Sequence, residues 1–281
     1  MRRISFFLAE IPFKYLAVIP VFIIIIFRLI DTEIDPGMEE NGKKVYEIME
    51  NVPAGSKVLV ITNYGPEAKY ELEETLSAMV GYFAAKETGI VFATLVPVGV
   101  ESAFMAVERS IGNPDFIKER YLYGYDYAHI GYIGGGTVGA FLLSSDISGS
   151  RKKDIYGNEL KTLPVMNGIE SFSDFSAVFE FSSRMIDGTP GMTLFSVLSG
   201  DKDLVKAVIC SSDMVPNYLP FYQSGSFDGF AGGFRDIAGL TKTVDPSSGI
   251  WKRYYIMSMI LEYVFIIIIL SGIRRFLRGD R

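Results

Sequence analysis

The feature that most constrains this chain is an apolar run near its C-terminus, from Tyr254 to Ile273. A helix of about twenty apolar residues is long enough to cross a hydrocarbon core of ~30 Å. Glu262 is the one acidic residue in this run, and the basic residues Arg274, Arg275 and Arg278 follow it. The sequence therefore predicts a C-terminal transmembrane helix with a basic tail.

A shorter apolar run, from Tyr15 to Ile30, predicts a second membrane span near the N-terminus. We interpret it as an uncleaved anchor, because it ends around Arg28 with no small-residue cleavage site behind it. Pro20 lies inside the run, and membrane helices tolerate proline better than soluble helices do.

Charged residues at the ends of the two runs predict the orientation of the chain. Arg2, Arg3 and Lys14 precede the first run, and the basic tail follows the second. Acidic residues follow the first run, although Lys252 and Arg253 stand just before the second. By the positive-inside rule we expect an integral membrane protein with two spans, cytoplasmic termini and an extracytoplasmic central domain.

The segment between the two runs alternates short β-branched stretches with helical patterns. Strands are predicted over 57–63, 90–97, 128–133, 175–182 and 206–211, and helices over 41–52, 67–86, 101–111, 138–143 and 193–199. Strand and helix in alternation are typical of an α/β fold with helices on both faces of a mostly parallel sheet. Rossmann-like and flavodoxin-like winding are the two alternatives.

These patterns divide the chain into four parts. We predict a tail and transmembrane helix over 1–31, and a linker with a short helix over 32–56. A Rossmann-like α/β domain follows over 57–240. The last part, 241–281, holds a pre-membrane linker, the second transmembrane helix and the basic tail. The glycine- and phenylalanine-rich segment 222–240 is expected to pack the domain against the membrane or a neighbour.

Composition excludes several classes of function. The net charge of −6 argues against general binding to nucleic acid. One cysteine, Cys210, rules out an intrachain disulfide, and the sole histidine, His129, cannot build a multi-histidine metal site. No catalytic motif is present, so we predict no catalytic residues, no metal and no cofactor.

The sharpest local signal is the glycine turn from Gly134 to Thr137, between a predicted strand and a predicted helix. Such a turn lets backbone N–H groups approach an anion at a helix N-terminus, although close packing of strand on helix requires glycine as well. A ligand would lie at the carboxyl ends of the strands. The predicted ligand-binding residues are Thr62, Asn63, Tyr64, Gly135, Gly136, Thr137, Ser182 and Asp213, with Ser183 and Ser212 at the same edge.

Two ionisable residues lie within the predicted spans. Glu262 is about eight residues inside the second run, and Arg28 is near the end of the first. A carboxylate at that depth is costly and usually faces protein or water. Three interpretations of Glu262 are open. It contacts Arg28 or a partner subunit and so joins two helices, it binds and releases a proton within the membrane, or it has no function.

Four stretches carry a likeness to a known family: 64–79 (YGPEAKYELEETLSAM), 123–136 (YGYDYAHIGYIGGG), 154–166 (DIYGNELKTLPVM) and 222–240. They resemble an uncharacterised family of prokaryotic membrane-anchored proteins with a Rossmann-like central domain. The likeness covers most of residues 55–240. It implies the architecture, and no activity comes with it.

Two functions fit these observations. The first is a membrane-anchored α/β domain that acts as a structural or scaffolding subunit of a membrane protein complex, with the lipid bilayer and either further copies of itself or other membrane subunits as partners. The alternative is a sensor or an enzyme that binds a small phosphorylated or nucleotide-like molecule at the carboxyl edge of the sheet. The sequence leaves the enzyme question open.

Overall fold

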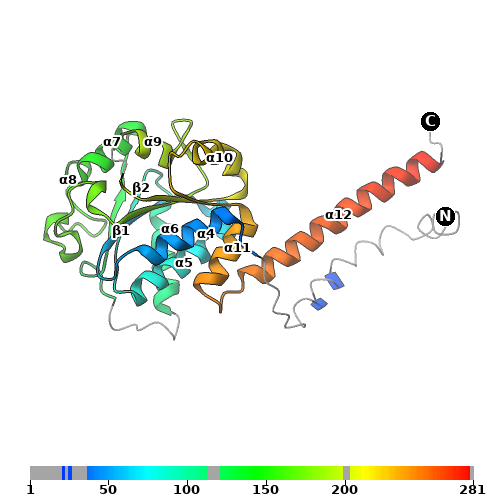
Figure 1. The fold of residues 1–281 in the computed structure, drawn as a ribbon, viewed down its shortest axis with the longest axis horizontal. Coiled ribbons are helices and arrows are strands. Elements are labelled where there is room, and N and C mark those ends of the chain that lie inside the picture. Colours follow the sequence, from blue (N-terminus) through cyan, green and yellow to red (C-terminus); the bar gives the residue numbers. More distant parts are fainter. Residues whose placement is uncertain (1–20, 23–24, 27–36, 113–120, 199–202, 279–281) are drawn as a thin grey trace. The chain divides into compact units, whose positions relative to one another are not determined.

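The computed structural model describes residues 21–22, 25–26, 37–112, 121–198 and 203–278. The chain forms two compact units (Figure 1). Residues 37–248 make up one of them, and the segments 1–36 and 249–281 belong to the other. The larger unit contains the whole sheet and the predicted ligand-binding residues.

A six-stranded parallel sheet forms the centre of the larger unit. Its strands lie in the order β3-β2-β1-β4-β7-β8, and every neighbouring pair is parallel. Counted along the chain, this is the 3-2-1-4-5-6 order of Rossmann folds, so the predicted α/β class and Rossmann-like winding are confirmed. The strands are β1 (Lys57–Asn63), β2 (Gly89–Thr94), β3 (Tyr127–Tyr132), β4 (Ala177–Ser182), β7 (Lys206–Cys210) and β8 (Gly229–Gly232).

Helices cover both faces of the sheet (Figure 1). One layer contains α4, α5, α6 and α11, which contact one another in the series α4–α11–α5–α6. The other layer contains α7, α9 and α10, together with the short helix α8. The first layer comprises α4 (Glu40–Asn51), α5 (Lys69–Ala85), α6 (Gly99–Gly112) and α11 (Gly233–Val244), and the second α7 (Thr137–Ser145), α8 (Ile147–Ser150), α9 (Gly191–Leu198) and α10 (Val215–Gln223).

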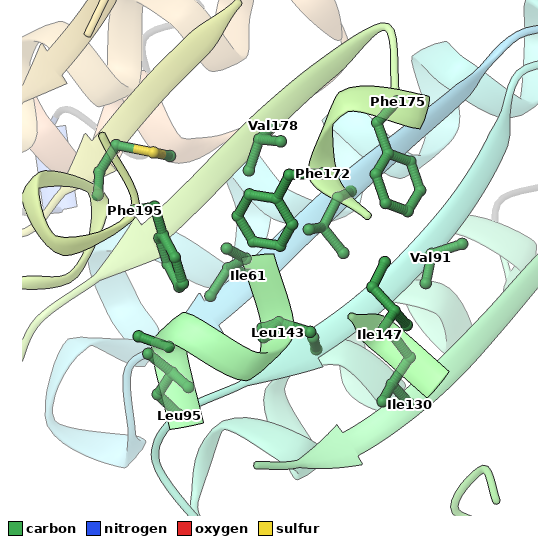
Figure 2. Packing of buried hydrophobic residues seen from close by; sticks show 14 of the residues in the cluster. Ile61, Val91, Leu95, Ile130, Leu143, Ile147, Phe172, Phe175, Val178 and Phe195 are labelled. Carbon is green, nitrogen blue, oxygen red and sulfur yellow. The ribbon is translucent and has the colours of Figure 1, made fainter. Parts of the chain in front are cut away.

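The core on the α7–α9 side follows from the alternation of side chains along each strand. Alternate residues of the strands, such as Ile61 and Val178, point to this face and are fully buried. Leu143 of α7 and Phe195 of α9 pack onto them (Figure 2). Short 3₁₀ segments complete the layer: η2 (Leu160–Thr162), η3 (Pro164–Met166) and η4 (Phe172–Asp174), with Phe172 fully buried in it.

The glycine- and phenylalanine-rich segment has a different role from the predicted one. Part of it is β8, the sixth strand, and part is α11, whose Ile237 and Leu240 are fully buried. A Cβ atom at Gly229 would lie 2.7 Å from Ile48 Cδ1 of α4. The glycine therefore leaves room for the Ile48 side chain where α4 lies against the edge strand, and the segment packs inside the domain.

The smaller unit contains the long helix α12 (Ile250–Arg278), with 29 residues. Large apolar side chains are exposed along it, namely those of Met257, Leu261, Val264, Phe265, Ile266, Ile268 and Ile269. Within the part of the chain that the structure describes, no helix is both long enough and apolar enough to cross a membrane.

Candidate functional site

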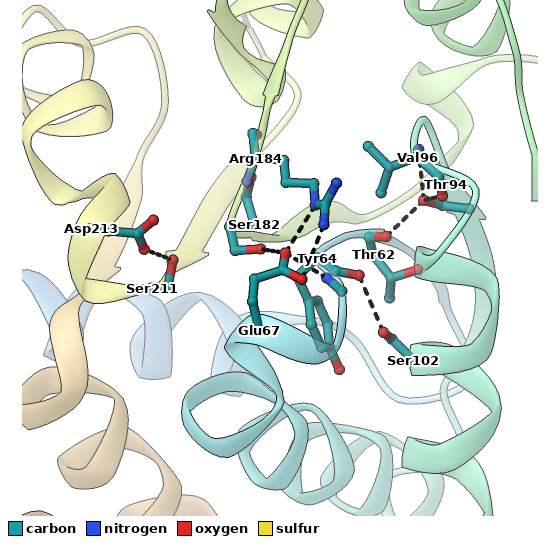
Figure 3. Close-up of polar contacts among 12 residues, drawn as sticks. Thr62, Tyr64, Glu67, Thr94, Val96, Ser102, Ser182, Arg184, Ser211 and Asp213 are labelled. Carbon is teal, nitrogen blue, oxygen red and sulfur yellow. Dashed lines mark hydrogen bonds and ion pairs between the residues drawn. The ribbon is translucent and has the colours of Figure 1, made fainter.

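In a Rossmann-like sheet the binding crevice lies where the strand order reverses, at the carboxyl ends of the two strands that flank this point. Here those strands are β1 and β4, which pair from Val58 with Ala177 to Asn63 with Ser182. The structure thus brings four of the predicted ligand-binding residues together at the crevice: Thr62, Asn63, Tyr64 and Ser182 (Figure 3 labels three of them).

The residues at the end of β1 are buried and already hydrogen-bonded within the domain. Thr62 Oγ1 donates to the Gly99 carbonyl at 2.8 Å and so holds the first turn of α6. The Asn63 Oδ1 atom accepts a hydrogen bond from the Leu95 N–H at 2.9 Å. Tyr64 is only 1% exposed. These side chains therefore fix the loops around the crevice and are not displayed to solvent.

A buried carboxylate, Glu180, lies at the centre of this arrangement. Its Oε1 atom accepts from Asn63 Nδ2 at 2.7 Å, and its Oε2 atom accepts from the Met192 N–H at 2.5 Å, in the first turn of α9. Gly191 has to be glycine here, because a Cβ atom would lie 2.1 Å from Glu180 Oε1. Burial raises the pKa of Glu180 to about 7, although hydrogen bonds from Asn63, Tyr218 and Met192 oppose the shift.

Sequence reasoning missed Glu180. The available signal was a lone acidic residue inside a run of apolar strand residues, Val178-Phe179-Glu180-Phe181. A carboxylate on a strand that is buried on both faces must find donors inside the protein. Its partners could not be inferred without the pairing of β1 with β4.

A second carboxylate, Glu67, forms an ion pair at the carboxyl ends of β1 and β4. Arg184 Nε lies 2.9 Å from Glu67 Oε1 and its Nη2 lies 3.0 Å from Oε2, which makes a bidentate pair (Figure 3). Ser183 Oγ donates to the same carboxylate at 2.8 Å. The hydrogen bonds from Arg184 lower the pKa of Glu67 to about 2. The pair joins the loop after β1 to the loop after β4.

The glycine turn before α7 binds the carboxylate of Asp187, a residue of the same chain. The Thr137 N–H donates to Asp187 Oδ2 at 2.8 Å, and Thr137 Oγ1 lies 3.1 Å from the same atom. Gly135 and Gly136 have positive φ, and a Cβ atom at Gly136 would lie 2.0 Å from Asp187 Oδ2. Asp187 therefore lies at the helix N-terminus where the sequence predicts a bound anion.

Asp187 is held there by a small hairpin. The two-stranded sheet of β5 (Met185–Ile186) and β6 (Thr189–Pro190) turns through Asp187 and Gly188. Both turn residues have positive φ, at 49° and 77°. Asp-Gly in this conformation is the signature of a tight type I′ turn, which fixes the direction of the Asp187 side chain.

The end of β7 is arranged in the same way. The Glu71 carboxylate, from the first turn of α5, accepts from the Ser212 N–H at 2.8 Å and from Ser212 Oγ at 2.7 Å. Ser211 Oγ donates to Asp213 Oδ1 (Figure 3). Ser182 Oγ donates to the carbonyl of Arg184 at 3.0 Å. Thr62, Asn63, Thr137 and Ser182 thus have side-chain partners inside the domain, whereas the buried Tyr64 hydroxyl has no hydrogen-bond partner among the described residues.

Two hollows in the surface of the domain lie away from this edge of the strands. They have volumes of about 400 Å³ and 580 Å³ and share Asp146, Ser148 and Lys161 in their linings. Neither hollow is lined by a predicted ligand-binding residue. Within the described residues, no group of three or more His, Cys, Asp or Glu side chains is placed to hold a metal ion.

His129 and Cys210 are both buried in the sheet. His129 Nδ1 accepts from the Gly131 N–H at 2.9 Å, and burial lowers the pKa of His129 to about 4. Burial also raises the pKa of the Cys210 thiol. Both properties belong to core residues that stay neutral at physiological pH.

The predicted intramembrane pair is only partly described. Arg28 lies outside the described residues, whereas Glu262 is exposed on α12. The contact between these two residues remains a prediction.

Comparisons of this chain with protein-family models, with curated proteins and with solved structures find no match.

Glu180 should make stability depend on pH. Its folded pKa of about 7 is above the unfolded value of 4.5, so its stabilising contribution is complete below pH 4.5 and is lost as pH rises through 7. Between about pH 5 and pH 8 the loss should approach about 3 kcal/mol. The difference in unfolding free energy between wild type and Glu180→Gln, measured by urea unfolding, should change by this amount over that range. Glu159→Gln, at an exposed position, is the control. If the difference in unfolding free energy between Glu180→Gln and wild type stays constant over this pH range, the raised pKa of Glu180 is refuted.

Asp187 should behave as the cap of α7. Asp187→Ala removes the acceptor of the Thr137 N–H and should lower the unfolding free energy by ~1 kcal/mol, as loss of an N-cap does. Asp187→Asn is the matched control, because asparagine retains an acceptor and tolerates positive φ. If Asp187→Ala and wild type have equal unfolding free energies, the contact between Asp187 and Thr137 does not stabilise the domain.

Proposed function

We propose that this chain is a membrane-anchored α/β domain that serves as a structural or scaffolding subunit of a membrane protein complex. The observation that supports this proposal is that carboxylates of the chain itself bind donor groups at the carboxyl edge of the sheet. Glu67 pairs with Arg184 at this edge. Glu71, Glu180 and Asp187 accept hydrogen bonds from backbone N–H groups in the turn after β7 and at the starts of α9 and α7. These carboxylates connect the loops to one another, which is a structural use of the edge.

The sequence supports the membrane anchors, whereas no helix within the described residues meets the length and apolarity that crossing a membrane requires. The run 254–273 lies within one continuous helix, and its side chains Leu261, Phe265 and Ile268 are 71%, 63% and 62% exposed. Exposed apolar side chains of this size require a nonpolar surrounding, and lipid provides one. The N-terminal run 15–30 is the proposed second anchor.

The orientation in this proposal places both termini in the cytoplasm and residues 37–248 outside, as the charges that flank the two runs indicate. Within the membrane, Glu262 is the proposed contact for Arg28 or for a partner subunit. Protease treatment of intact spheroplasts should degrade the domain if this orientation is correct, and should leave it intact if the orientation is reversed.

Membrane anchoring predicts that the chain stays with the membrane under conditions that release peripheral proteins. After alkaline carbonate extraction, full-length protein should sediment with the membranes, because burial of two apolar segments does not depend on charge. Deletion of residues 250–281 should weaken this retention. A full-length chain that remains dispersed in buffer and does not bind vesicles would refute the proposal.

One observation favours the alternative function. The strand order gives the domain a Rossmann-like switch point between β1 and β4, where such folds bind nucleotides. A small phosphorylated ligand would have to displace the Glu67–Arg184 pair or the Asp187 carboxylate. We expect no thermal stabilisation by a panel of nucleotides and phosphorylated metabolites. Saturable stabilisation that Gly135→Val or Thr137→Ala abolishes would establish the alternative.

A further inference from the structure

The turn that follows η3 contains one of the two Asn-Gly pairs of this chain. Asn167 has φ −60° and ψ 125°, Gly168 has φ 77°, and the Ile169 N–H donates to the Met166 carbonyl at 3.0 Å. These values define a type II β-turn, with glycine at the position that needs positive φ. Both central residues are exposed, and a Cβ atom at Gly168 would meet nothing within 4 Å. The Asn167 side chain and the peptide group after it are therefore open to water.

An exposed Asn-Gly pair can modify itself in water. The glycine nitrogen attacks the side-chain Cγ of the asparagine, a C–N bond forms, and the Cγ–Nδ2 bond breaks. The amide group leaves as ammonia and takes the proton of the glycine nitrogen with it. Water then opens the resulting succinimide at either carbonyl, which gives aspartate or isoaspartate. The attack requires a peptide nitrogen without its proton and open access to Cγ, and glycine gives this access because it has no side chain.

The Gly168 nitrogen is free for this attack. Within the described part of the chain, the Gly168 N–H makes no hydrogen bond. Rotation about the Cα–C bond of Asn167 brings this nitrogen to Cγ, and one hydrogen bond, from Ile169 to Met166, spans the two central residues. Exposed turns of this kind open locally at little cost in free energy. The backbone therefore allows the ring to close.

Lys57, the first residue of β1, promotes the loss of the proton. Its Nζ donates to the carbonyl oxygen of Asn167, which belongs to the same peptide group as the Gly168 nitrogen. When this nitrogen loses its proton, resonance spreads the negative charge onto that oxygen. A cationic donor placed where charge develops stabilises the anion. The lysine side chain is long and flexible, so it can follow the oxygen as Asn167 rotates.

The other Asn-Gly pair, Asn41 with Gly42, lies in a different setting. It belongs to the first turn of α4, and Gly42 is buried. A Cβ atom at Gly42 would lie 2.7 Å from Met38 Cγ, so the surroundings are crowded. The helical backbone also fixes the rotation about the Cα–C bond of Asn41. The same dipeptide is thus protected at one position of the domain and open at the other.

We infer that Asn167 is a self-modification site, which converts to aspartate and isoaspartate through attack by the Gly168 nitrogen, with Lys57 as the residue that promotes this step. The inference does not rest on the proposed function, because it depends only on contacts within residues 37–248. Isoaspartate adds one carbon to the backbone before Gly168 and so displaces Ile169, which is buried in the core of the α7–α9 side.

Peptide mapping by mass spectrometry tests the site. When full-length protein in mild detergent is incubated in mildly alkaline buffer, Asn167 should convert faster than Asn41, at a rate that rises with pH. In urea the two residues should convert at similar rates, because unfolding removes both α4 and the Lys57 contact. An Asn167 that stays intact in the native protein while both residues convert in urea would overturn the inference. Equal conversion of the two residues in the native protein would also overturn it.

Variants of Lys57 test the mechanism. Lys57→Gln should lower the conversion rate of Asn167 by about three- to tenfold, because a charge-assisted hydrogen bond is lost at a position where solvent screens it. Lys57→Arg retains the charge and should retain the rate. Lys161→Gln is the matched control, because Lys161 is exposed and lines the same hollow as Asn167, and it should convert as wild type does. A native Lys57→Gln protein that converts as fast as wild type, or faster, would refute the role of Lys57.

Discussion

The fold depends on a buried chain of hydrogen bonds that begins at Leu95 and ends in α9. The Leu95 N–H donates to Asn63, Asn63 donates to Glu180, and Glu180 accepts from the Met192 N–H. These contacts connect the end of β2 with β1, β4 and the first turn of α9. In an interior of low dielectric constant such bonds are strong, and removal of one member leaves its neighbours buried without partners. The strand ends and loops on this side of the sheet take their positions from this network.

The same principle recurs along the whole carboxyl edge. Helix N-termini carry partial positive charge and N–H groups that need acceptors. In Rossmann-like proteins that bind nucleotides, phosphate supplies the acceptor after the first strand. In this chain Asp187 supplies it for α7, Glu180 for α9, and Glu71 for the turn after β7. At these three positions the chain supplies its own acceptors, and this supports the proposed structural function of the domain.

The two helical layers differ in the side chains that are exposed on their outer surfaces. The α4–α5–α6–α11 layer contains both points where the chain leaves the domain, and its outer surface carries ion pairs such as Lys43 with Glu40. The α7–α9 layer instead has an exposed apolar face in uncharged segments.

The sequence by itself determined the α/β class, the positions of β1, β2, β3, β4 and β7, and the helices α4, α5, α6, α7 and α9, because buried parallel strands and amphipathic helices leave clear local patterns. It did not predict α8, α10 or α11. It did not reveal β8, whose four residues include two glycines and no long apolar run. It also placed Thr62, Asn63, Tyr64 and Ser182 at one edge, since the ends of parallel strands must meet there.

Only the tertiary structure decided what those residues do. Asn63 and Glu180 are 117 positions apart, and Thr137 and Asp187 are 50 positions apart. No local pattern records such pairs, because the contact is created by the order of the strands and the path of a hairpin. The sequence could therefore show where a ligand would bind in a fold of this class, whereas the fold showed that carboxylates of the chain itself bind Asn63 and Thr137.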